Sequence, residues 1–128
     1  MKKLLAVALM TMVSCGAFAD SWKKLGERKV SFGNETDVIH VSGLKGKYNK
    51  ISLRVTDAPV RLNKITVVFG NGKKQQFFIN KRLEKGQKTR AFALLNGPRI
   101  VNKVELDYKK AAGGGFKSAE VKLYGLKD

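Results

Sequence analysis

Basic residues in two polar segments of this chain are the residues most able to do chemistry. Segments 81–88 and 109–117 together hold seven lysines and arginines against one acid, Glu84. Cations gathered in this way attract polyanions, so the chemistry that they predict is anion binding. The predicted anion-binding residues are Lys81, Arg82, Lys85, Lys88, Lys109, Lys110 and Lys117. Phe116 stands among them as an aromatic ring able to stack on a ligand or to touch a membrane.

Other residue types offer little catalytic or metal chemistry. His40 is the only histidine and Cys15 the only cysteine, so neither a multi-histidine metal site nor a relay of two histidines can be built. Glu35 and Asp37 lie close together near a turn, but acid–base work or calcium binding would need further partners that the sequence does not supply. We assign both to turn capping. We therefore expect a non-catalytic protein with no cofactor and no metal.

The first nineteen residues have the plan of a secretory signal peptide. Lys2 and Lys3 precede an apolar run, and Ala17-Phe18-Ala19 offers a cleavage site before Asp20. No later segment is apolar for long enough to span a bilayer. We therefore predict a signal peptide over residues 1–19, a periplasmic or secreted protein, and no integral membrane span. A lipoprotein with lipid on Cys15 is the alternative.

Residues 20–128 are about the length of one domain, and we predict a single one. The first nineteen residues hold two lysines and no acid, so their removal lowers the net charge from +16 to +14. Their removal also takes away the only cysteine, so packing alone must hold the fold. The excess of positive charge either serves a polyanionic partner or only keeps the protein soluble.

The stretch 61–79 predicts a β-hairpin around Gly70-Asn71-Gly72, because apolar and polar residues alternate on both sides of it. A two-residue turn would mix polar and apolar residues on one face. A three-residue loop with Gly72 left-handed instead sets Ile65 opposite Phe77 and Val67 opposite Gln75, and we favour it. This register leaves Val68 and Phe78 on the outer side, where we expect a cover.

The same alternation predicts the other strands, in segments 21–32, 37–41, 51–55, 89–95, 99–108 and 119–123. Trp22 and Leu25 are expected in the core, and segments 89–95 and 99–108 are expected to pair. No window shows a sustained apolar period near 3.6, so helix is at most one short turn at 81–85. About eight strands with closely spaced turns predict an all-β antiparallel sandwich of jelly-roll or Greek-key type. A closed barrel is the second choice.

Several short motifs follow one another along the chain in an order that is typical of a known family. They are Lys24-Leu25-Gly26, Asn34-Glu35-Thr36-Asp37, a Val-x-Phe strand, Lys85-Gly86-Gln87-Lys88-Thr89 and a closing Val-x-Leu-x-Gly. With these motifs the chain resembles the YaaI-like family of small exported bacterial proteins over most of residues 20–128. That family is classed as a domain of unknown function. The resemblance implies an exported β-sandwich and carries no catalytic residue over to this chain.

Two functions remain open. The first is a binding module for an anionic partner at the cell envelope: a lipid or lipopolysaccharide head group, an acidic glycan, a nucleic acid or an acidic protein. The second is a structural or assembly protein that meets another protein through a sheet edge or an outer apolar face. Salt separates them, because polyanion binding weakens steeply with ionic strength and sheet-edge pairing does not.

Overall fold

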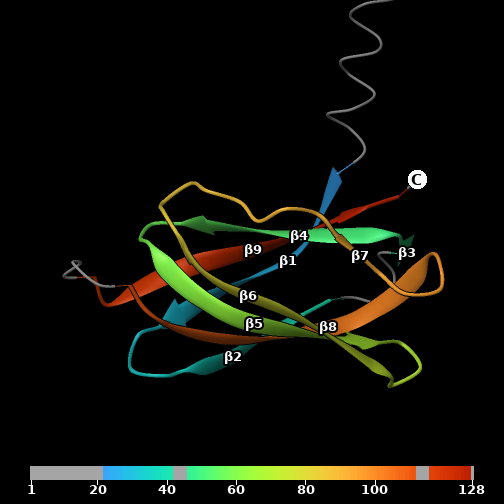
Figure 1. Cartoon of the computed structure of the whole chain (residues 1–128), viewed down its shortest axis with the longest axis horizontal. Coiled ribbons are helices and arrows are strands. Elements are labelled where there is room, and N and C mark those ends of the chain that lie inside the picture. The colour runs from blue at the N-terminus through green and yellow to red at the C-terminus, as the bar shows by residue number, and fades with distance from the viewer. Residues whose placement is uncertain (1–21, 42–45, 112–115, 128) are drawn as a thin grey trace, which may run out of the picture.

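Two antiparallel β-sheets packed face to face form the body of the molecule (Figure 1). The computed structural model describes residues 22–41, 46–111 and 116–127. The strands of the described residues are β1 (Trp22–Ser31), β2 (Thr36–His40), β3 (Lys47–Tyr48), β4 (Lys50–Thr56), β5 (Val60–Phe69), β6 (Lys74–Leu83), β7 (Phe92–Ala93), β8 (Arg99–Lys110) and β9 (Ser118–Leu126).

The strand order is that of a jelly roll. One sheet runs β1-β9-β4-β7 and the other β2-β8-β5-β6, with β3 paired to the start of β8. The pairs are nested along the chain: β1 with β9, β2 with β8, β4 with β7, and the central hairpin β5 with β6. The predicted β-sandwich is therefore confirmed, and the two sheets do not close into the barrel that was the second choice.

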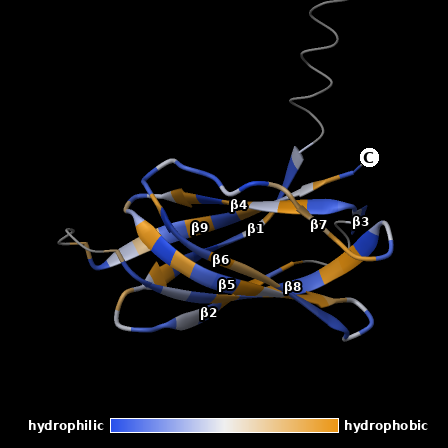
Figure 2. Cartoon of the chain, viewed as in Figure 1, coloured by the Kyte–Doolittle hydropathy of each residue, from blue (hydrophilic) through white to orange (hydrophobic). Residues whose placement is uncertain are grey.

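Alternation along the strands builds the core between the sheets. Ile51, Leu53 and Val55 of one sheet and Ile65 and Val67 of the other are fully buried. Figure 2 shows the result as hydrophobic and hydrophilic residues following one another along β5. The largest fully buried side chains are Tyr48, Tyr108 and Phe92. Because the inner faces take nearly all the apolar residues, most charged residues remain on the outer faces.

The central hairpin has the predicted register. Ile65 lies opposite Phe77 and Val67 opposite Gln75, and Gly72 has a φ of +86°. The Phe69 amide donates to the Lys73 carbonyl at 2.8 Å, which closes the loop over Gly70-Asn71-Gly72. Glycine suits this position because a left-handed backbone carries no steric cost there.

Segment 89–95 does not pair with segment 99–108, so that prediction is wrong. It runs antiparallel along β4 instead, with Phe92 opposite Ile51 and Ala93 opposite Lys50. Strand β8 has no free edge for it, because β2 and β5 already flank β8. Phe92 also packs on Phe77 of the other sheet, with ring centroids 4.9 Å apart, so the segment covers one open side of the sandwich.

Three further predictions concerned a helical turn at 81–85, the core residues Trp22 and Leu25, and a cover over Val68 and Phe78. Residues 81–83 belong to β6, and the described residues contain no helix. No helix within those residues has the length and apolar character needed to cross a membrane. Leu25 is buried as expected, but Trp22 is only half-buried and pairs with Leu126, on the outer side of its sheet. Val68 is buried, whereas its expected companion Phe78 is 66% exposed.

Candidate anion-binding site

Several connections of the chain gather at one end of the sandwich, which we call the basic end. The turns at 32–35 and 57–59 and the start of the connection after β6 lie together at the left of Figure 1. Pairing gives the reason: Val60 at the start of β5 lies opposite Leu83 at the end of β6 and Lys110 at the end of β8. The basic end therefore brings together Lys81, Arg82, Lys109 and Lys110, which are far apart in the sequence.

A row of three cations crosses the sheet at the basic end. Arg61 lies directly opposite Arg82 of β6 on one side and Lys109 of β8 on the other. All three alternate with the buried residues Val60, Leu62, Leu83 and Tyr108, so they share the outer face of the sheet. We call Arg82, Arg61 and Lys109 the cation row. Neighbouring strands are about 4.8 Å apart, so the three side chains start within reach of one another.

A break in the alternation of β5 gives Arg61 its outward position. The pairing of β5 with both neighbours shifts between Leu62 and Lys64. Before this irregularity the even-numbered Val60 and Leu62 are buried, and after it the odd-numbered Ile65 and Val67 are buried. Strict alternation back from Ile65 would have turned Arg61 inward, because a one-residue slip moves every side chain to the other face. Sequence reasoning missed Arg61 for this reason, although the change of parity was visible in the apolar pattern.

The positive charge of Arg82 is partly neutralised by Glu84, an acid in the connection that follows β6. Its Nε lies 2.8 Å from Oε2 and 3.2 Å from Oε1 of Glu84, and its Nη2 lies 3.2 Å from Oε1. The hydrogen bond from Arg82 lowers the pKa of the Glu84 carboxyl, and the same bond raises the pKa of Arg82. Among the described residues no ion pair joins Arg61 or Lys109 to an acid. The uncompensated charge of the cation row is therefore carried by Arg61 and Lys109.

The remaining predicted residues lie further from the cation row. Lys85 is exposed in the turn that joins β6 to the opposite sheet. Lys88 forms a bridge with Arg54 of β4, so it belongs to the other sheet. The Lys117 carbonyl accepts the Phe32 amide at 3.0 Å next to the start of β9, and its neighbour Phe116 is 48% exposed. The structure thus brings four of the seven predicted cations to the basic end, of which Arg82 and Lys109 share the face of the cation row, and it moves Lys88 to the other sheet.

The acids near the basic end serve structural contacts. Asp37 Oδ1 accepts Arg28 Nε at 2.8 Å and the Val38 amide at 2.9 Å. Asp107, one rung from the cation row, accepts Asn63 Nδ2 at 3.2 Å. Within the described residues no three His, Cys, Asp or Glu side chains are grouped as metal ligands. These acids therefore hold the strands β1, β2, β5 and β8 together.

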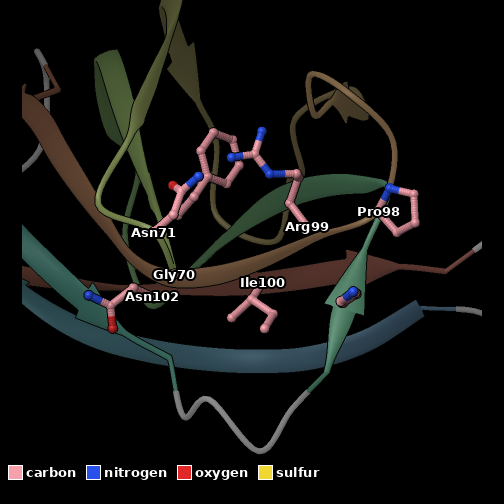
Figure 3. Close-up of a pocket in the computed structure, with 8 residues that line it drawn as sticks. Gly70, Asn71, Pro98, Arg99, Ile100 and Asn102 are labelled. Atoms are coloured by element: carbon pink, nitrogen blue, oxygen red, sulfur yellow. The ribbon is translucent and has the colours of Figure 1, made fainter.

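A hollow at the opposite end of the molecule gives a second, smaller group of cations (Figure 3). Its volume is about 490 Å³, and Arg99, Ile100 and Asn71 lie on its wall. The Arg99 guanidinium lies 3.9 Å from the centroid of the Phe69 ring, and its Nη1 donates to the Leu95 carbonyl at 3.1 Å. Arg99 thus closes the core over Phe69, which leaves Lys47 as the other cation of the hollow.

The sequence of this chain matches the model of a protein family. A family model described as "Domain of unknown function (DUF2541)" matches residues 4–125. The chain belongs to the DUF2541 family. The match confirms that part of the sequence resemblance that concerned a domain of unknown function. No curated protein matches this DUF2541 protein.

Solved structures share the fold of this DUF2541 protein. AlgX of Pseudomonas aeruginosa matches with a TM-score of 0.54 and 15% identity, over 83% of this chain and 27% of AlgX. The chain thus spans about a quarter of AlgX, and the likeness concerns the β fold alone. The family 32 CBM of C. perfringens NanJ, solved in complex with galactose, matches with a TM-score of 0.38 and 11% identity, over 80% of this chain and 98% of that chain.

Proposed function

We propose that this DUF2541 protein is a non-catalytic domain that binds an anionic partner at the cell envelope through its basic end. The observation that carries the proposal is the cation row, in which Arg61 stands between Arg82 and Lys109 on one outer face. Lys81 and Lys110 are exposed at the ends of the same strands, but they lie opposite the buried Leu62 and Val60 and so start from the inner side of the sheet. The partner would be a lipid or lipopolysaccharide head group, an acidic glycan, a nucleic acid or an acidic protein.

The cation row should lower the stability of the fold, and this supports a role for it in binding. Like charges directly opposite one another in a sheet destabilise it. Arg61 has a like charge on both sides, and of these three cations Arg82 alone forms an ion pair with an acid of the described residues. An anion placed over Arg61 and Lys109 would relieve this repulsion and would meet two charged donors fixed to neighbouring strands. Binding of this kind loses affinity steeply as the salt concentration rises.

Export belongs to the same proposal. The signal peptide predicted over residues 1–19 lies outside the described residues, as do the predicted cleavage site at Ala17-Phe18-Ala19 and the alternative lipid site at Cys15. The motifs that resemble the YaaI-like family support an exported protein. We expect the mature protein to begin at Asp20 in an intact-mass measurement, in the periplasm or the medium. A lipid-bearing species that begins at Cys15 would instead place it on a membrane surface.

Charge reversal at the cation row tests the proposal against net charge alone. The test variant carries Arg61→Glu with Lys109→Glu. The matched control carries Lys73→Glu with Lys74→Glu at the hairpin tip, which changes the net charge equally and alters exposed residues at the other end. Both proteins and the unaltered one are applied to immobilised heparin and to vesicles containing phosphatidylglycerol, over a series of salt concentrations.

We expect the cation-row variant to leave the heparin at clearly lower salt than the control, because specific contacts are lost with the charge. Each lost phosphate or sulfate contact should reduce the slope of log affinity against log salt by about 0.7–0.9. Tighter binding to the vesicles than to heparin would favour a lipid head group as the partner, and the reverse order would favour a glycan. Equal elution of the two variants would show that overall charge, and not the cation row, holds the polyanion.

A sheet-edge assembly protein is the second candidate, and exposed Phe78 is the observation that favours it. Phe78 is 66% exposed on β6, a ten-residue strand at the edge of its sheet. The same strand carries Lys74, Lys81 and Arg82, and charges of this kind protect an edge against pairing. Phe78→Ser should therefore leave the partner bound if the cation row is the binding site. Loss of a salt-resistant complex in this variant would support the assembly function.

A further inference from the structure

A groove lies on the outer face of the other sheet, β1-β9-β4-β7, away from the cation row. Its volume is about 410 Å³, and its wall includes Trp22, Ser52, Arg54, Lys88, Arg90 and Tyr124. Strand pairing accounts for this set, because Tyr124 lies opposite Ser52 and Lys88 lies opposite Arg54. The inward neighbours Ile51, Leu53 and Leu123 are fully buried, so these residues face outward.

Two aromatic rings line one part of this groove. Trp22 lies at the start of β1 opposite Leu126, and Tyr124 lies two residues before Leu126 on β9. Both side chains are half-buried. Tryptophan and tyrosine side chains combine a large apolar surface with a polar group, which suits contact with ligands that have an apolar and a polar side. Both rings belong to the wall of the groove, and each is partly covered by its neighbours and partly open to a ligand.

The opposite wall of the groove is fixed to β4 by buried hydrogen bonds. Ser52 Oγ donates to the Thr89 carbonyl at 2.9 Å, and Thr89 Oγ1 accepts the Leu53 amide at 3.0 Å. The Thr89 amide donates in turn to the Leu53 carbonyl at 2.8 Å. Both Ser52 and Thr89 are buried. The wall that carries Lys88 and Arg90 is therefore held in place before any ligand arrives, which lowers the entropy cost of binding.

Three cations on this wall lack a neutralising acid among the described residues. Arg54 Nε donates to the Gly86 carbonyl at 3.0 Å, which orients the guanidinium and leaves its terminal amino groups for a ligand. The Arg90 guanidinium lies 4.7 Å from the centroid of the Phe92 ring. Lys88 is exposed beside them.

The acids of the same outer face are paired elsewhere. Glu27 forms an ion pair with Lys24, and Glu120 lies 3.7 Å from Lys122. Both pairs belong to β1 and β9, and Lys122, which lies directly opposite Arg54, is the cation that pairs with Glu120. The groove therefore combines apolar rings on its β1-β9 side with uncompensated positive charge on its β4 side.

We propose that this groove binds an acidic carbohydrate, with one sugar ring against Trp22 and Tyr124 and its carboxylate or sulfate on Arg54 and Lys88. A pyranose ring has an apolar C–H face that can lie on an aromatic ring, and its acidic substituent projects from the edge of that ring. Single-stranded nucleic acid would need rings that project far enough for bases to stack on them. The half-buried rings of this groove favour the sugar.

This inference extends the proposed function, because it names an acidic glycan as a ligand and gives it a site separate from the cation row. The two sites lie on different sheets and share none of the residues that define them. Either site can therefore fail in an experiment without the other.

Trp22 is the only tryptophan of the chain, so its fluorescence reports directly on the groove. The probe is tetragalacturonate, titrated into the whole mature protein at low salt. Its fully methyl-esterified form is the matched control ligand, since it keeps the rings and lacks the charge. We expect the Trp22 fluorescence to change to a saturating value as the acid is added, and the ester to bind at least tenfold more weakly. No change with the acid, or equal affinity for both ligands, would overturn the proposal.

Matched variants locate the binding. Arg54→Gln with Lys88→Gln should weaken tetragalacturonate binding at least tenfold, and Tyr124→Ala should also weaken it, whereas Tyr124→Phe keeps the ring and should bind as before. Lys88→Gln alone serves if the double variant loses its native circular dichroism. The cation-row variant Arg61→Glu with Lys109→Glu should leave the Trp22 response unchanged, whatever its effect on heparin binding. If oligo(dT) changes the Trp22 fluorescence at lower concentrations than tetragalacturonate does, the proposal is overturned in favour of nucleic acid.

Discussion

The two outer faces of this sandwich place positive charge in different ways. On the sheet β2-β8-β5-β6, three cations lie side by side across neighbouring strands with no aromatic ring among them. On the sheet β1-β9-β4-β7, cations stand on a fixed wall beside Trp22 and Tyr124. A flat row of charges suits any polyanion that can approach it, whereas a groove with rings adds a requirement for shape.

The strand connections therefore organise the excess positive charge of this chain. The cation row forms because three strands begin or end at the basic end. The groove forms because segment 84–95 crosses from β6 to β4 and carries Lys88 and Arg90 with it. Four substitutions test how far each outer face depends on the packing beneath it. They are given from the largest to the smallest expected effect on the free energy of unfolding.

The largest effect should come from Gly125→Val under the groove face. A Cβ at Gly125 would lie 2.7 Å from Tyr48 Cδ1 and 2.8 Å from Leu25 Cδ1, both of which are buried. We expect a loss of about 3 kcal/mol in the free energy of unfolding, because overpacking forces side chains and backbone to move. Chemical denaturation measures it. Gly33→Ala is the control, since its nearest neighbour is Ser31 Oγ at 3.7 Å, and a loss of equal size there would contradict the packing argument.

The second test compares one buried threonine from each face. Thr89→Val removes the hydroxyl that accepts the buried Leu53 amide, and we expect a loss of about 2 kcal/mol from the unsatisfied donor. Thr66 on the other sheet is 7% exposed against 8% for Thr89, but it lines a surface pocket, and no hydrogen bond to another described residue holds its hydroxyl. Thr66→Val should be nearly neutral in the same denaturation experiment. Equal losses would show that the wall of the groove is not held by Thr89.

The third test concerns the contact that joins the two sheets beneath the cation row. The Tyr108 hydroxyl donates to the Ser31 carbonyl at 2.9 Å, and Tyr108→Phe should cost about 1 kcal/mol at neutral pH. Burial, and then the charge of Asp37, raise the pKa of Tyr108, while Arg28 opposes the shift.

The direction of this pKa shift sets the pH dependence. The unfolded chain loses the tyrosine proton at a pH of about 10, before the folded chain does. The stability that Tyr108 supplies is therefore present below that pH and falls as the pH rises through the folded pKa. The difference between the two proteins should narrow above a pH of about 10 in denaturation curves. A constant difference up to the highest accessible pH would contradict the shift.

The smallest effect should come from Arg61→Gln in the cation row. Removal of the central charge relieves two like-charge contacts, so we expect the free energy of unfolding to rise by no more than about 0.5 kcal/mol at low salt. The gain should vanish at high salt, because exposed charges are screened there. Thermal unfolding at two salt concentrations measures it, with Lys73→Gln as the control. Destabilisation by Arg61→Gln would mean that the guanidinium supports the fold.

Much of the fold could be predicted from residues close together in the sequence. The period of two gave the strands, and Gly70-Asn71-Gly72 gave the hairpin register, because these features depend on neighbouring backbone and side chains. The seven predicted cations were chosen as the basic residues of two polar connections between strands. Four of them do meet at the basic end, since strand ends that follow reversals of the chain must lie near one another.

Tertiary structure decided which residues complete each group of charges. Segment 89–95 pairs with β4 because β8 has no free edge, and this non-local choice places Lys88 opposite Arg54, on the other sheet from the cation row. Trp22 lies on the outer face although its apolar character suggested the core. Arg61 enters the cation row because a register shift in β5 reverses the inward and outward positions. Local periodicity fixes which residues alternate, but only pairing with distant strands fixes the face to which they turn.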